Sequence, residues 1–213
     1  MAKSLKNKLI TFLAIFLIFF GAFAMLYGIY RGYPSWIFWF CYISMILIGI
    51  GALRKDSLLI ASQFNILFFP LLFWDIDFFL VLFSGNSYLG IAGYFFEEML
   101  ILARIISLEH LFLIPMILYL LYLIKIKKKD ILKSYIISIF QVSLIFAVMK
   151  ILNANIDNVN CVFENCYSFF NFLVPYANYS VLWFLVYFIM LLLSNLLLFG
   201  IFKIIYRKNN SFK

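Results

Sequence analysis

The sequence predicts an all-α membrane protein, a polytopic bundle of transmembrane helices without a soluble domain. Of its 213 residues, 67% are hydrophobic and only 12% are charged, whereas soluble domains average about 45–50% apolar and about 25% charged residues. The charges also cluster between long apolar segments rather than within them. A water-soluble fold of this length has no interior large enough for so much apolar surface, so we expect most of it to face lipid.

Seven apolar segments are each long enough to cross a hydrocarbon core of about 30 Å, for which roughly 17 residues are the minimum. Charged or turn-forming residues separate them, such as RGYP at 31–34, RKD at 54–56 and KIKKKD at 125–130. We expect these segments to form a single transmembrane domain over 1–213. The predicted spans are 9–30, 35–53, 57–74, 78–96, 105–124, 131–152 and 178–202.

The segment 78–96 is the least regular of the seven because SGNS interrupts it at 84–87. Seven crossings place the two basic termini on opposite sides of the membrane, although basic segments favour the cytoplasmic side. The alternative is six crossings plus a re-entrant segment over 78–106, which brings both termini, RKD and KIKKKD to one side. Because 78–96 is long enough to cross, seven spans are our first expectation.

We expect a multi-pass protein of the plasma membrane, with a cytoplasmic C-terminus and an extracellular loop at 153–177. This loop contains acidic residues and no lysine, as is typical of an outer face. Its Cys161 and Cys166 form either a disulfide or two free thiols, depending on the Cα geometry. No second cysteine pair or nearby histidine completes a zinc site around them.

Membrane lipids are the expected partners of the basic residues. The net charge of +8 resides mainly between and outside the spans, and no basic domain exists to bind nucleic acid. Nothing in the sequence indicates a protein partner. The chain contains no P-loop, no G-x-G-x-x-G and no H-E-x-x-H motif, so we expect no cofactor and no metal.

Polar residues inside predicted spans are the candidate functional residues, because they are expensive at membrane depth and tend to face the bundle interior. They have two interpretations. They converge on one polar centre, or they serve as interhelical hydrogen bonds worth about 0.6 kcal/mol each, which needs no chemistry. The set comprises Ser62, Gln63, Asn65, Ser107, Gln141 and Asn195.

His110, the only histidine, is the candidate catalytic residue, since an imidazole titrating near about 6.5 can act as a general base. Its neighbour Glu109 projects about 100° away on a helix, so we expect a carboxylate at the membrane interface rather than a partner of His110. Ser107, one turn earlier, is expected to hold one ring nitrogen through its hydroxyl. Pro115 predicts a bend below His110.

Five pieces of the sequence occur in a characteristic order, and together they carry a resemblance. With them the chain resembles the YwaF-like bacterial integral membrane proteins and, more distantly, their animal relatives among membrane-embedded lipid hydrolases and acyltransferases. The resemblance covers roughly 57–193 and implies a helix bundle. The pieces are SQFNIL (62–67), GIAGY (90–94), EHLFLIP (109–115), ILNAN (151–155) and FLVPYANYSVLWF (172–184).

For the animal relatives, the resemblance implies a buried histidine paired with a cysteine or threonine nucleophile that acts on acyl-lipid esters. His110 matches the histidine. The cysteine expected in the third span is absent, since Phe64 and Asn65 stand there. At the threonine expected in the second span, the chain has Phe40 and Cys41, of which only Cys41 can substitute chemically; by its position alone, Cys41 is a small apolar filler.

The expected function is therefore that of a multi-pass membrane protein acting on acyl lipids within the bilayer, with His110 as general base. The alternative is a non-catalytic membrane scaffold, accessory subunit or small transporter. A His110→Gln substitution separates the two, because glutamine keeps a hydrogen-bonding side chain but does not titrate near neutral pH.

Overall fold

The structure is a computed structural model that describes residues 3–152, 158–166 and 178–207. In these ranges the regular structure is entirely helical, with no strand. Short 3-10 helices lie in the connections: η1 (Pro34–Phe38), η2 (Gly93–Phe96) and η3 (Val159–Cys161). The α-helices are α1 (Lys3–Tyr30), α2 (Phe40–Arg54), α3 (Ser57–Ser84), α4 (Ile101–Ser107), α5 (Glu109–Ile124), α6 (Lys128–Ile151) and α7 (Tyr179–Arg207).

The described part of the chain has five helical segments that are long and apolar enough to cross a membrane. The prediction of a helical membrane bundle is confirmed at this level. The fifth predicted span corresponds to α4 and α5, which only Leu108 separates and which together make one segment. Helix α2 has 15 residues and is shorter than each of these five segments, but η1 ends only two residues before it begins. The five segments are Ser4–Tyr30, Ser57–Ser84, Ile101–Ile124, Lys128–Ile151 and Tyr179–Tyr206.

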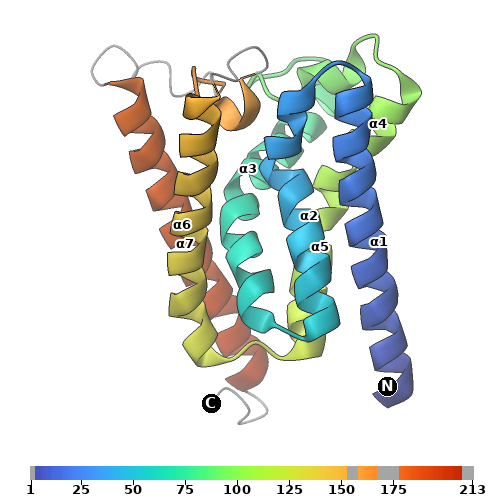
Figure 1. Cartoon of the computed structure of the whole chain (residues 1–213), viewed down its shortest axis with the longest axis vertical. Coiled ribbons are helices and arrows are strands. Elements are labelled where there is room, and N and C mark those ends of the chain that lie inside the picture. The colour runs from blue at the N-terminus through green and yellow to red at the C-terminus, as the bar shows by residue number, and fades with distance from the viewer. Residues whose placement is uncertain (1–2, 153–157, 167–177, 208–213) are drawn as a thin grey trace.

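The helices run side by side in one bundle, as Figure 1 shows, with the start of α1 and the end of α7 at the same end. Helix α3 is central and packs against α2, α5, α6 and α7, whereas α1 packs mainly on α2. The turns after α2 and α5 lie at the end that holds both termini. The loops after α3 and α6 lie at the opposite end (Figure 1).

The segment 78–96, which the sequence predicts as a fourth span, is not a separate helix. Its first part continues α3 to Ser84, where Gly85 takes a left-handed conformation with φ of 74° and ends the helix. The rest contains only η2 and lies at the upper end of the bundle in Figure 1. There Ala92 and its apolar neighbours pack on Trp74 of α3. These residues form a small apolar cluster with the end of α3 instead of a further helix.

Candidate functional site

The polar residues predicted at membrane depth separate into two groups in the structure, and the larger group is a network of hydrogen bonds between helices. At its centre, the amides of Gln63 and Gln141 bond each other at 2.9 and 3.1 Å. Ser44 of α2 donates to Gln63 Oε1 at 2.8 Å, and Gln63 Nε2 donates to Ser62 Oγ at 2.9 Å. This part links α2, α3 and α6.

The second part of the network joins α3, α6 and α7. Asn65 Nδ2 donates to the hydroxyls of Ser134 and Ser138 at 3.2 and 3.3 Å. Asn195 Nδ2 donates to the carbonyl of Ile131 at 2.8 Å and to Ser134 Oγ at 3.2 Å. All these side chains are neutral amides and hydroxyls, which supports the interpretation as structural hydrogen bonds.

The second group contains Ser107 and His110 and borders a cavity of about 570 Å³. The cavity lies between α2, α3, α5, the segment after α3 and the loop that contains η3. Most of its lining is aromatic or aliphatic, and the ionisable side chains of Cys41, Glu109 and His110 meet there. A mostly apolar cavity with a few convergent polar groups is the usual form of a ligand or active site.

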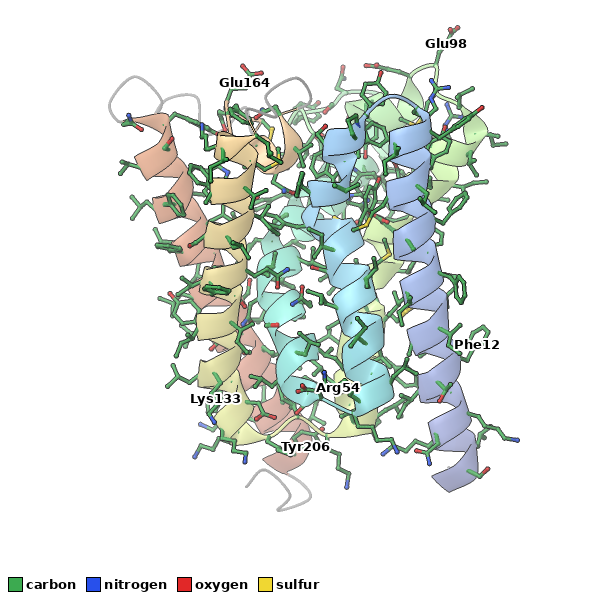
Figure 2. The ribbon with its side chains drawn as sticks, in the orientation of Figure 1. Phe12, Arg54, Glu98, Lys133, Glu164 and Tyr206 are labelled. Carbon is green, nitrogen blue, oxygen red and sulfur yellow. A yellow bond between two sulfur atoms is a disulfide. The ribbon has the colours of Figure 1, made fainter. Side chains whose placement is uncertain are left out.

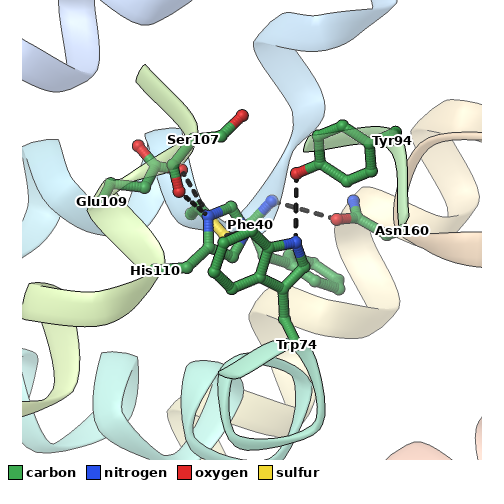
Figure 3. Close-up of polar contacts among 8 residues, drawn as sticks. Phe40, Trp74, Tyr94, Ser107, Glu109, His110 and Asn160 are labelled. Carbon is green, nitrogen blue, oxygen red and sulfur yellow. Dashed lines mark hydrogen bonds and ion pairs between the residues drawn. The ribbon is translucent and has the colours of Figure 1, made fainter. Parts of the chain in front are cut away.

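His110 is held in a defined orientation within this cavity. Its Nδ1 lies 2.8 Å from the backbone carbonyl of Ser107. A carbonyl oxygen only accepts hydrogen bonds, so in the neutral ring Nδ1 carries the proton and Nε2 keeps its lone pair. The Trp74 ring stacks on the imidazole with centroids 4.5 Å apart (Figure 3). The predicted contact with Ser107 therefore exists, but through the backbone rather than the hydroxyl.

The free nitrogen of His110 faces a thiol. Nε2 lies 3.9 Å from Sγ of Cys41, a residue 69 positions away in the sequence. Cys41 is buried at 8% exposure and is the only free cysteine among the described residues. A thiol beside the unprotonated nitrogen of an oriented imidazole has the arrangement of a nucleophile and its general base.

Glu109 differs from its sequence-based expectation. It is buried inside the protein at 1% exposure, and both carboxyl oxygens lack a hydrogen-bond partner among the described residues. Its Oε1 lies 4.0 Å from His110 Nδ1 (Figure 3). Glu109 and His110 are neighbours in the first turn of α5, and both border the cavity that α5 forms with the other helices, which is where Glu109 is buried.

Asn160 fixes the start of the helix that carries Cys41. Its Oδ1 accepts the N–H of Phe40 at 3.0 Å, as Figure 3 shows. Its Nδ2 donates to the carbonyl of Phe38 at 2.7 Å. Its own carbonyl accepts Trp183 Nε1 of α7 at 3.1 Å. Asn160 thus ties the first turn of α2 to α7 and sets the position of the thiol.

The disulfide alternative is the one present in the structure: Cys161 and Cys166 are bonded, with Cα atoms 5.6 Å apart. Both border the cavity, and Cys161 directly follows Asn160. The rest of the predicted outer loop, 153–157 and 167–177, lies outside the described residues.

Asp77 anchors the segment that follows α3. Its carboxylate accepts hydrogen bonds from the Ser87 hydroxyl at 2.6 Å and from the N–H groups of Leu89, Ile91 and Ala92 at 2.8–3.0 Å. Further along the segment, the Tyr94 hydroxyl accepts Trp74 Nε1 at 3.1 Å, as Figure 3 shows. Through these contacts the segment closes one side of the cavity.

Replacing Asp77 by alanine should release this segment. Backbone donors would lose their acceptor at a cost of about 1–3 kcal/mol, and Glu97 and Glu98 should become more accessible to a glutamate-specific protease. The matched control is Asp75→Ala, which removes a carboxyl whose Oδ1 has no partner among the described residues. Equal cleavage rates for the two variants would show that Asp77 does not anchor the segment.

Sequence reasoning alone missed Trp74, Asp77 and Asn160, which position the site without taking part in a recognisable motif. Cys41 was visible only through the resemblance, because nothing in its own span links it to a histidine 69 residues away. No family model, curated protein or solved structure matches the chain. The interpretation of the site therefore depends on its own geometry.

Proposed function

We propose that the protein is a membrane-embedded enzyme that transfers acyl groups from lipid esters, with Cys41 as nucleophile and His110 as general base. One observation carries the proposal: Cys41 Sγ lies 3.9 Å from His110 Nε2 while the Ser107 carbonyl occupies Nδ1. The acceptor of the acyl group is water in a hydrolase or a second lipid in an acyltransferase, and the first half of the reaction is the same in both.

The proposal places the enzyme in the plasma membrane with six crossings and both termini in the cytoplasm. The even number follows if η1 and α2 together form one crossing beside the five long segments. The distribution of charge supports this orientation. Arg54 and Lys133 lie at the end that holds both termini, and Glu98 and Glu164 at the other (Figure 2). The turns at the terminal end also contain Lys55, Lys125, Lys127, Lys128 and Lys129.

In the first half-reaction, the proton of the Cys41 thiol moves to His110 Nε2 as Sγ attacks the ester carbonyl carbon. The tetrahedral intermediate collapses by breaking the bond to the alcohol oxygen, which takes the proton from Nε2. The product is a thioester on Cys41 and a free alcohol, such as a lysolipid. Water or a lipid hydroxyl then gives its proton to Nε2 and attacks the thioester, and Nε2 returns that proton to the sulfur.

The first turn of α2 can supply donors for the oxyanion of the tetrahedral intermediate. The first N–H groups of an α-helix have no acceptor within the helix. The N–H of Phe40 is already taken by Asn160, which leaves those of Cys41 and Tyr42 as the nearest to the sulfur. N–H groups at the nucleophile that stabilise the developing oxyanion are a usual device of acyl transfer.

The cavity suits an acyl chain better than a polar substrate. Its walls include Leu67, Leu71, Ile106 and aromatic residues of η1 and α3. The bundle around it exposes many large apolar side chains, as expected of a protein that meets its substrate within the bilayer. Transfer of an aliphatic chain from water to such surroundings is favourable by about 0.8 kcal/mol of free energy for each CH₂ group. The free energy is smaller for a lipid that is already in the bilayer.

The direct test is to trap the thioester. Protein reconstituted in nanodiscs is incubated with p-nitrophenyl palmitate, and the peptide that contains Cys41 is examined by mass spectrometry. We expect a palmitoyl adduct on Cys41 that neutral hydroxylamine removes, and no such adduct in Cys41→Ser. The absence of an adduct together with unchanged ester turnover in Cys41→Ser would overturn the proposal.

A further inference from the structure

Cys41, Glu109 and His110 also form a set of metal ligands. One ligand atom from each residue lies within 4.8 Å of the other two. Thiolate, imidazole and carboxylate are the three ligand types that zinc proteins use, and three protein ligands with an open fourth position are typical of reactive zinc sites. Glu109 and His110 are adjacent in sequence, but Cys41 lies far from both. For this reason no metal-binding spacing was visible in the sequence.

The unpartnered carboxyl group of Glu109 is the observation that points to a cation. It is 1% exposed, and neither oxygen has a hydrogen-bond partner among the described residues. A buried carboxylate without a compensating charge is costly. Among the described residues, no Lys or Arg side chain lines this cavity to supply that charge. A divalent ion held by a thiolate, a carboxylate and a neutral imidazole forms a centre of zero net charge, which an apolar environment tolerates.

One of the three separations between ligand atoms is close to that of a tetrahedral site. Ligand bonds of about 2.0–2.3 Å place ligand atoms about 3.3–3.8 Å apart, and the separation of Cys41 Sγ and His110 Nε2 is 3.9 Å. The carboxyl oxygen of Glu109 lies 4.0 Å from His110 Nδ1, so the Glu109 side chain must rotate toward Nε2 to complete the set, and no hydrogen bond among the described residues restrains it. The cavity leaves space for the fourth ligand.

The surroundings of His110 match those of a metal-bound histidine. Its Nδ1 is hydrogen-bonded to the Ser107 carbonyl. Metal-ligating histidines almost always donate their second ring nitrogen to a carbonyl, a carboxylate or water, which directs the other nitrogen at the metal. A sulfur ligand disfavours Mg²⁺ and Ca²⁺, which prefer oxygen, and favours Zn²⁺ or Co²⁺.

We propose that Cys41, Glu109 and His110 bind one Zn²⁺ ion, and that this ion inhibits acyl transfer. The ion takes the sulfur that attacks the ester and the nitrogen that accepts its proton, so metal and substrate exclude each other. The inhibitory role depends on the function proposed above, whereas binding of the metal does not. The site would thus be active only in its metal-free form.

Metal binding is tested with Co²⁺. Its tetrahedral complexes absorb visible light, and a thiolate ligand adds an absorption band in the near ultraviolet. Untagged protein in detergent, stripped with a chelator, is titrated with Co²⁺ and then with Zn²⁺ as competitor. We expect one Co²⁺ per chain, with both sets of bands displaced by Zn²⁺. In Cys41→Ser the thiolate band should vanish, and in Glu109→Gln the affinity should fall by at least about tenfold. Asp75→Asn, which removes a carboxyl outside the trio, should bind like the wild type.

The two proposals fail separately in this design. Absence of Co²⁺ binding, or binding that Cys41→Ser and Glu109→Gln leave unchanged, overturns the metal site even if the ester is still turned over. Binding of Co²⁺ by a protein that forms no palmitoyl thioester overturns the enzyme and leaves the metal site in place. If the protein both binds the metal and turns over the ester, turnover of p-nitrophenyl palmitate should fall as Zn²⁺ saturates the site. Full turnover at saturation would refute inhibition.

Discussion

Replacing His110 by glutamine is expected to lower turnover of p-nitrophenyl palmitate by about 100- to 10,000-fold, the usual contribution of general acid–base catalysis. Glutamine can still donate its amide N–H to the Ser107 carbonyl, which His110 Nδ1 contacts at 2.8 Å. It cannot accept and return the thiol proton near neutral pH. The loss should appear in both ester turnover and the rate at which the Cys41 thioester forms.

A suitable control for this variant is Ser194→Ala. Ser194 lies on α7, is fully buried, and its hydroxyl has no partner among the described residues, so its removal tests the effect of a buried polar deletion outside the cavity. We expect wild-type turnover for it. Two results would favour the non-catalytic alternative of a scaffold, accessory subunit or transporter. The first is wild-type turnover in His110→Gln, and the second is the absence of turnover in both His110→Gln and Ser194→Ala.

Composition and segment length sufficed to predict a membrane helix bundle, because both depend on the thickness of the bilayer rather than on details of packing. The predicted spans 57–74 and 131–152 fall within or beside α3 and α6. The prediction failed for 78–96 because apolar content does not show where a helix ends: residues 78–84 extend α3, and the remainder contains only the short helix η2. The interruption at 84–87 was the informative signal, and it favoured the alternative without a full fourth span.

The site was harder to predict than the fold, because its members come from different helices. His110 stood out as the only histidine, and it lies in the cavity. The burial of Glu109 depends on how several helices pack around the cavity, which its own stretch of sequence does not reveal. By contrast, Ser134, Ser138 and Gln141 follow one another on α6 at intervals of four and three residues, which places them on one face of the helix. This spacing could have added the two serines to the predicted polar set.

Replacing Gly49 by leucine is expected to prevent α1 from packing on α2 and to destabilise the folded protein by at least about 3 kcal/mol, the upper part of the usual range for overpacking. A Cβ atom at Gly49 would lie 2.6 Å from the backbone carbonyl oxygen of Ala14 and 2.5 Å from Ile18 Cγ1. Gly21 makes a similar approach to the carbonyl of Tyr42 from the other helix. Small residues at such positions allow membrane helices to pack closely. The loss is measured as a lower unfolding temperature in detergent.

Gly200 of α7 provides the matched control, since a Cβ atom there meets nothing within 4 Å. Gly200→Leu should fold normally. The alanine variants Gly49→Ala and Gly200→Ala should shift stability in opposite directions. Gly200→Ala should stabilise by about 0.5–1 kcal/mol, because alanine favours a helix, whereas Gly49→Ala already places its methyl group against a backbone oxygen. An unchanged unfolding temperature for Gly49→Leu would mean that α1 does not pack on α2 as described. In that case α1 would not hold α2, and with it Cys41, in position.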